Sequence, residues 1–121
     1  MIEERAASGA GDELSDAEAL ERGRAGDHDA FAVLVHRYEG GLRRYLRRAL
    51  DDPDLAEDTL QETFLELFRA VQAGSELPAL QGWLYRAATN NALDAVRRRR
   101  FRQRLRDLVL RAQPLVRDPG A

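Results

Sequence analysis

The sequence contains no cysteine and no lysine, and its 121 residues include one tryptophan. The absence of cysteine excludes disulfides, thiol catalysis and thiolate metal sites, and it suits a reducing compartment. No apolar run approaches the roughly 20 residues that a membrane span requires. The N-terminal stretch MIEERAASGAGDELS lacks the basic and then apolar order of a signal peptide. We therefore expect a soluble, cytoplasmic protein that has no membrane partner.

Patterns typical of catalysis and metal binding are also missing. The two histidines, His28 and His36, are not spaced as a catalytic pair or as metal ligands. The acidic stretch DDPDLAED lacks the spacing and the central glycine of an EF-hand, and no phosphate-binding glycine loop or nucleophile elbow occurs. We predict no catalytic residues, no metal, no cofactor and no small-molecule substrate, so the chain is not expected to be an enzyme.

Charge is segregated along the chain. The net charge is −2, yet residues 97–106, RRRRFRQRLR, contain seven arginines. Residues 1–29 and 51–76 carry net charges of −6 and −7, whereas residues 30–50 and 77–106 carry +4 and +7. This distribution predicts two surfaces of opposite charge and favours two different partners.

Helical periodicity and helix caps organise residues 15–112. Ser15 precedes Glu18 at capping-box spacing, Asp27 can cap a helix running to about Leu50, and the DDPD stretch can start another that ends near Ala73. After the loop GSELPALQ, a fourth helix is expected from Leu80 or Gln81 to about Arg111. The pattern predicts an all-α antiparallel bundle of three to four helices, after a flexible acidic tail (1–14) and before a linker or disordered tail (113–121).

The third predicted helix has a polar face that a core does not explain. Five residues fall within about a third of its circumference: Asp58, Gln61, Glu62, Leu65 and Arg69. A solvated face with one exposed leucine is the simpler interpretation, because single exposed leucines are common. The functional interpretation is a docking surface with an apolar anchor among acids, suited to a basic partner.

The fourth predicted helix has a basic face. One nearly straight stripe contains Arg86, Asn90, Leu93, Arg97, Arg100 and Arg104. Arginines in such a row can follow a phosphate backbone, and Asn90 can hydrogen-bond a base edge. A solvated basic helix end is the alternative. On the other side, Asn91 lies among small apolar residues and needs a hydrogen-bond partner if it is buried. Tyr85, close to the preceding loop, is a candidate for stacking on a base.

These two faces, in this order, resemble a known family. The segments AEDTLQETFLELFRA and GWLYRAATNNALDAVRRR carry the likeness, which extends over about residues 18–102. They resemble the promoter-melting second domain of bacterial RNA polymerase sigma factors, in particular the extracytoplasmic-function (ECF) group. The resemblance implies binding to core RNA polymerase and recognition and melting of the minus-ten promoter element in transcription initiation.

The resemblance also assigns roles to residues. It implies that Asp58, Gln61, Glu62 and Leu65 bind the coiled coil of the polymerase beta-prime subunit. It implies that the minus-ten element faces Arg86, Asn90, Arg97 and Arg100, and that Arg43, Arg44 and Arg47 help to hold the non-template strand. The helical pattern itself adds Tyr85 and Arg104 as candidate DNA contacts. It implies that a flipped base enters the loop of Gly74, Ser75, Glu76 and Leu77. An anti-sigma factor is a further partner that the resemblance suggests.

Other functions stay open at this point. These sigma factors carry a C-terminal domain that reads the minus-thirty-five element, and the sequence given stops at QPLVRDPGA. One alternative is therefore an interaction module that binds polymerase or an anti-sigma factor without directing initiation. Another is an arginine-rich RNA-binding domain, which would show steep salt dependence and indifference to changes at Asp58 or Glu62.

Overall fold

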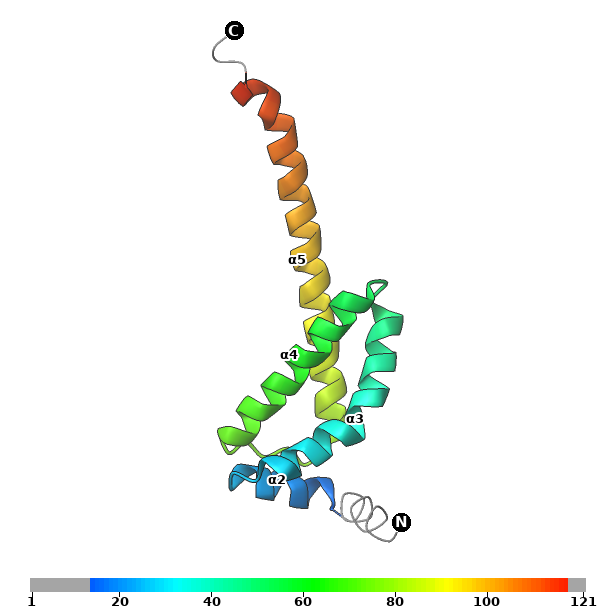
Figure 1. Cartoon of the computed structure of the whole chain (residues 1–121), viewed down its shortest axis with the longest axis vertical. Coiled ribbons are helices and arrows are strands. Elements are labelled where there is room, and N and C mark those ends of the chain that lie inside the picture. Colours follow the sequence, from blue (N-terminus) through cyan, green and yellow to red (C-terminus); the bar gives the residue numbers. More distant parts are fainter. Residues whose placement is uncertain (1–13, 118–121) are drawn as a thin grey trace.

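The computed structural model describes residues 14–117, and all regular structure in this range is helical. The helices are α2 (Asp16–Arg24), α3 (His28–Ala49), α4 (Pro53–Gln72) and α5 (Leu80–Arg117). In Figure 1, α3 and α4 run in opposite directions beside the first half of α5, and α2 lies across one end of the three. The prediction of an all-α bundle is confirmed.

Local capping explains where the helices begin. The Ser15 hydroxyl accepts the Glu18 N–H at 3.1 Å, and the Asp27 carboxylate accepts the Ala30 N–H at 3.2 Å. Asp52 accepts the N–H of Asp54 at 2.9 Å, and Pro53 occupies the first turn of α4. Each such cap contributes about 1 kcal/mol. The predicted starts of these helices are therefore confirmed.

Two helix ends depend on backbone geometry, and one differs from the prediction. Gly26 and Gly74 follow α2 and α4 with φ of +96° and +78°, a region that glycine enters without a steric penalty. The α5 helix does not end near Arg111, as periodicity had suggested, but continues to Arg117.

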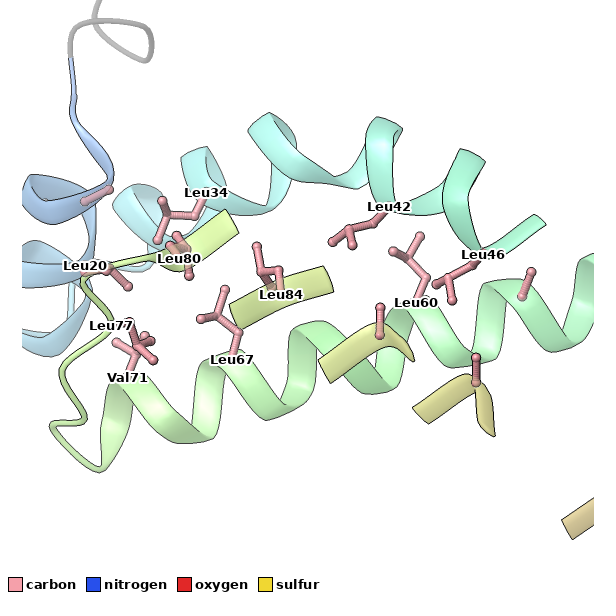
Figure 2. Close-up of a cluster of buried hydrophobic side chains, with 14 of the residues drawn as sticks. Leu20, Leu34, Leu42, Leu46, Leu60, Leu67, Val71, Leu77, Leu80 and Leu84 are labelled. Carbon is pink, nitrogen blue, oxygen red and sulfur yellow. The ribbon is translucent and has the colours of Figure 1, made fainter. Parts of the chain in front are cut away.

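A leucine-rich core joins the four helices. Figure 2 shows leucines of α3 directed toward α4 and the start of α5. The largest fully buried side chains include Leu34, Leu42 and Leu46 from α3, Leu67 from α4 and Leu84 from α5. Burying each leucine contributes about 1.5–3 kcal/mol. This core holds α4 and α5 rigidly, so their outer faces keep a fixed relation to each other.

One polar pair sits at the packed interface of α4 and α5. The Thr63 side chain is 0% exposed, and its hydroxyl donates to the Thr59 carbonyl at 2.8 Å. The Asn91 amide in turn donates to the Thr63 hydroxyl at 3.2 Å. The partner that Asn91 was expected to need is therefore Thr63.

Polar contacts tie α2 to α3. Arg37 of α3 donates to the Asp16 carboxylate at 2.6 Å and to the Leu14 carbonyl at 2.6 Å. The Tyr38 hydroxyl donates to the other oxygen of Asp16. Burial, followed by the hydrogen bond and the negative charge of Asp16, raises the pKa of Tyr38 from 10.0 to about 12. The start of α2 is thereby held on α3.

The second half of α5 extends beyond the bundle (Figure 1). Every residue from Arg97 to Gln113 is exposed, whereas Ala95 is 5% exposed and Val96 packs against the core. We call residues 97–113 the arm. Across residues 14–117, none of the helices combines the length and the apolar character needed to cross a membrane.

Candidate functional site

The acidic stripe of α4 lies on the surface. Asp58, Gln61 and Glu62 are exposed, and the Leu65 side chain is 42% exposed although it belongs to a helix with six buried residues. The helical phase inferred from sequence is correct, because Leu60, Leu67 and Val71 on the other side are buried. The stripe forms a ridge with a groove on each side.

The groove on the α3 side is mainly apolar. It encloses about 410 Å³, and Gln61 and Leu65 line it together with Phe31, Phe64 and Phe68. The Phe31 and Phe68 rings meet edge to face, with centroids 5.3 Å apart. Beside the exposed Leu65, this groove can accept an apolar side chain of a partner.

An ion pair closes one end of this apolar groove. The Arg43 guanidinium of α3 donates two hydrogen bonds, each 3.1 Å long, to the Glu57 carboxylate of α4. Those hydrogen bonds hold the pKa of Glu57 below its ordinary value. The pair therefore stays charged at neutral pH and links α3 to α4 beside the groove.

The groove on the α5 side is polar. It encloses about 680 Å³ and is lined by Asp58 and Glu62 of α4 and by Arg98 and Arg102 of α5, among others. The acidic stripe thus borders arginines of its own chain across this groove. A basic partner that approached from the α5 side would be repelled by Arg98 and Arg102. Contact with the ridge carboxylates is therefore favoured from the side of the apolar groove.

The basic stripe of α5 is exposed along its whole predicted length. The exposed members are Arg86, Asn90, Leu93, Arg97, Arg100 and Arg104. Leu93 is 50% exposed in the middle of the stripe. The Arg97 guanidinium lies 3.7 Å from Asp94, and both side chains are more than half exposed, so this pair is weak. A polyanion can replace Asp94 at little cost.

Tyr85 of α5 and Arg44 of α3 both lie close to Gly41 of α3. The Tyr85 ring is half-buried, edge to face with the Tyr45 ring at 5.2 Å. A Cβ atom at Gly41 would lie 2.8 Å from the Tyr85 hydroxyl oxygen and 3.9 Å from an Arg44 guanidinium nitrogen. Glycine at position 41 therefore leaves room for the Tyr85 hydroxyl to pack against α3. The packing of Tyr85 leaves only part of its ring available for stacking on a base.

Arg47 contributes to the electrostatics of the neighbouring helix. Its side chain is exposed, and its positive charge helps to lower the pKa of Glu57 on α4, after the larger effects of the Arg43 hydrogen bonds. Of the three α3 arginines that the resemblance assigns to the non-template strand, Arg43 is engaged by Glu57, whereas Arg44 and Arg47 are exposed.

The predicted flipped-base loop is anchored at two points. Gly74, Ser75 and Glu76 are exposed, whereas Leu77 is 8% exposed and belongs to the core, as Figure 2 shows. Leu77 therefore anchors the loop, and its side chain is not open to a ligand. On the outer side, Arg24 of α2 donates to the Ser75 carbonyl at 2.7 Å.

Sequence reasoning did not identify Arg24. The residue precedes Ser75 by 51 positions, and nothing in the local pattern of α2 indicates that its side chain reaches the loop. The same guanidinium is paired with Glu21 at 3.1 Å, one turn earlier in α2. Arg24 thus joins α2 to the segment between α4 and α5.

Comparison with known proteins assigns this arrangement to a family. Residues 34–102 match the family described as Sigma-70 region 2. The chain belongs to that family. This Sigma-70 region 2 segment contains the acidic stripe of α4, the loop and most of the basic stripe of α5, so the candidate surfaces fall within the matched residues.

Relatives of the Sigma-70 region 2 chain include ECF RNA polymerase sigma-E factors. Those of Haemophilus influenzae, Salmonella typhimurium and Escherichia coli are each 35% identical over 81 residues, or 67% of this chain. The chain spans 42% of the length of these relatives. The likeness to the ECF group expected from sequence is confirmed by these matches.

Proposed function

We propose that this chain binds core RNA polymerase through α4 and opens promoter DNA through α5 and the loop before it. The observation that carries the proposal is the fixed pairing of two exposed faces of opposite charge within a member of the Sigma-70 region 2 family. The acidic ridge with Leu65 suits a basic protein surface, and the arginine stripe suits a polyanion. A single bundle can therefore bring DNA to polymerase, in the cytoplasm.

At the polymerase surface, we propose that the beta-prime coiled coil lies along the ridge of Asp58, Gln61, Glu62 and Leu65. An apolar side chain of the partner would enter the groove between α3 and α4, next to Leu65. Basic side chains of the partner would face the ridge carboxylates. The Arg43–Glu57 pair, which lines this groove, links α3 to α4 beside the proposed contact.

At the promoter, Arg86, Asn90, Arg97 and Arg100 would follow the non-template strand of the minus-ten element. Extruding one base from the duplex costs a few kcal/mol of stacking and pairing. The exposed backbone of Gly74, Ser75 and Glu76, held by Arg24 and Leu77, supplies a loop that needs little ordering when a base enters. Arginine contacts to the freed strand offset the rest of the cost. The protein would make and break no covalent bond in this process.

The experiment that tests the polymerase contact is binding of the chain to bacterial core RNA polymerase, alongside Glu62→Arg. We expect the wild-type chain to bind and Glu62→Arg to lose binding, because a cation would replace an anion in the centre of the ridge. Asp107→Arg is the matched control: it changes the net charge equally but lies on the exposed arm. Circular dichroism should give the same helical content for all three proteins.

The outcomes separate the alternatives. Failure of the folded wild-type chain to bind, or equal binding by Glu62→Arg, would contradict the polymerase proposal. Retained polymerase binding without opening of promoter DNA would instead favour a module that binds polymerase, or an anti-sigma factor, without directing initiation.

A further inference from the structure

The arm of α5 exposes a row of apolar side chains that neither the bundle nor the predicted DNA stripe uses. Phe101, Leu105 and Leu108 are 64%, 50% and 61% exposed. Their spacing, continued by Ala112, is that of the inward-facing a and d positions of a coiled coil. An exposed apolar row of this kind on a helix indicates an interaction surface.

Arginines flank this row on both sides. In the heptad that puts Phe101 and Leu108 at d and Leu105 at a, Arg102 occupies an e position and Arg104 a g position. These two positions face the charged residues of a partner helix. The exposed Phe101 ring is surrounded by arginine side chains of the arm.

Only part of the positive charge of the arm is compensated by carboxylates of the described residues. Arg97 and Arg99 lie 3.7 and 3.8 Å from Asp94 and Asp52, and Arg98 and Arg102 border the polar groove. Among the residues that the structure describes, no carboxylate lies within 4 Å of the following arginines: Arg98, Arg100, Arg102, Arg104 and Arg106. Successive arginines four positions apart, such as Arg98 with Arg102, repel each other along the helix. A helix that lacks tertiary packing and repels itself is poorly stabilised, and a negatively charged partner would relieve both deficits.

We propose that the arm is a docking strip for an acidic amphipathic helix of a partner protein. The two helices would pair as a short two-stranded coiled coil. Leucine-like side chains of the partner would cover Phe101, Leu105 and Leu108. Glutamate or aspartate at its e and g positions would pair with Arg102 and Arg104. The partner is defined by this chemistry: an apolar heptad seam between acidic flanks.

A second copy of the chain fits this strip poorly. In a parallel pair, Arg97 at g would oppose Arg102 at e of the other copy. In an antiparallel pair, Arg104 at g would oppose a g position of the other copy, which is again an arginine. Like charges at these positions select against pairing. Nucleic acid would neutralise the arginines but would leave the apolar row without an apolar contact, so an acidic helix satisfies more of the surface.

The docking strip overlaps the predicted DNA stripe at Arg97 and Arg104, which both occupy g positions. A helix seated on the row would compete with phosphates for these guanidinium groups. Phe101, Leu105 and Leu108 themselves lie outside the DNA stripe. The two activities can therefore be separated by mutation of the apolar row.

The test uses the whole chain and a synthetic three-heptad peptide with leucine at a and d and glutamate at e and g. A second peptide keeps every glutamate but has serine at a and d. We expect the leucine peptide to bind and the serine peptide to bind at least about tenfold more weakly, because its apolar contacts are lost. Fluorescence anisotropy of labelled peptides at physiological salt measures both affinities.

Variants of the chain locate the peptide. L105Q combined with L108Q should weaken binding of the leucine peptide by about tenfold or more. L110Q is the matched control, because Leu110 is 54% exposed but occupies the outward f position of the same heptad. Exchanging Arg102 and Arg104 for glutamate should transfer the preference to a peptide with lysine at e and g.

Several results would overturn the proposal. They are absence of peptide binding, equal affinity for the leucine and serine peptides, and equal loss in L110Q and in the double variant. Sedimentation showing that the chain alone dimerises through Leu105 would replace the acidic helix with a second copy. Leu65→Asp alters the ridge in the groove on the α3 side, away from Arg102, and should bind the peptide normally. Failure of the polymerase proposal and failure of this one are therefore distinguishable.

Discussion

The guanidinium of Arg24 on α2 donates to the carbonyl of Ser75, in the loop between α4 and α5, at 2.7 Å. This bond joins the shortest helix of the bundle to the segment for which we propose base binding. The Ser75 N–H is also satisfied, since it donates to the Ala70 carbonyl at 3.0 Å. With Leu77 buried on the inner side, the loop backbone is held from two directions.

We predict that Arg24→Ala loosens the loop more than it destabilises the bundle. The bond is exposed, so its loss should lower the free energy of unfolding by no more than about 1 kcal/mol. Amide hydrogen exchange at Ser75 and Glu76 should become faster, and affinity for single-stranded DNA should fall while polymerase affinity is unchanged.

Two variants control the Arg24 experiment. Arg24→Lys should recover part of the slow exchange, because an ammonium group can also donate to a carbonyl. Arg22→Ala, an exposed change in the same turn of α2, should leave the loop as it is. Unchanged loop exchange in Arg24→Ala would show that the Arg24 bond does not order this segment, and that Leu77 and the bond from Ser75 to Ala70 are sufficient.

We predict that Thr63 and Asn91 are energetically coupled. Thr63→Val should lower the free energy of unfolding by about 1–3 kcal/mol, because it leaves the half-buried Asn91 amide without its partner. Replacing both groups by apolar ones, as in Thr63→Val with Asn91→Leu, should recover much of this loss. Urea unfolding of the single and double variants gives the coupling energy.

The neighbouring amide provides the control for this cycle. Asn90 is exposed on the DNA stripe, so Asn90→Leu with Thr63→Val should show additive effects. Additivity in the Thr63 and Asn91 pair as well would mean that their hydrogen bond contributes nothing to stability.

Local patterns in the sequence predicted most of the helices but not their tertiary contacts. Ser15, Asp27 and Asp52 cap helices through bonds to residues two or three positions away, so the sequence alone indicates them. The need of Asn91 for a partner was also predictable from its face of the helix. That the partner is Thr63, 28 positions earlier, depends on how α4 packs on α5.

The candidate surfaces were likewise predictable where they depend on one helix, and unpredictable where they form between helices. Helical phase placed Glu62 and Leu65 outside the core, because a single helix determines which residues share a face. The apolar groove beside Leu65 was not predictable, since Phe31 of α3 lines it together with α4 residues. Likewise, the burial of Leu77 and the reach of Arg24 arise only when α2 and α4 meet the loop.

We predict that Tyr38 makes the fold sensitive to alkaline pH. The pKa of its hydroxyl is raised from 10.0 to about 12 in the folded chain, by burial and then by the bond to Asp16. Between these values the unfolded chain has lost a proton that the folded chain retains. The stability that this group contributes is therefore complete below about pH 10 and is lost as the pH rises through about 12.

Tyr38→Phe tests this assignment. The variant should be less stable at neutral pH, where it lacks the bond to Asp16, and its stability should fall less steeply above about pH 10. Urea unfolding across that range measures both slopes, and their difference isolates Tyr38 from the other tyrosines. Parallel slopes for the variant and the wild type would assign the alkaline loss to other groups.

We predict that Arg97→Ala weakens binding of single-stranded DNA without changing polymerase affinity or the fold. Arg97 is exposed, and its pair with Asp94 is weak, so stability should stay within about 0.5 kcal/mol of the wild type. The plot of log K against log salt concentration has a negative slope. Removal of one phosphate contact should make this slope less steep by about 0.7. Titrations of a short labelled oligonucleotide of mixed sequence at several salt concentrations give this slope.

Arg106→Ala is the matched control for Arg97, because it removes the same charge from the arm but lies outside the stripe of Arg97, Arg100 and Arg104. If the stripe guides the strand, the salt slope should change in Arg97→Ala and stay close to the wild-type value in Arg106→Ala. Equal changes in both would indicate a diffuse attraction to the arm. Equal losses of DNA and polymerase affinity in Arg97→Ala would contradict the separation of two binding surfaces, since α5 and the α4 ridge would then act as one.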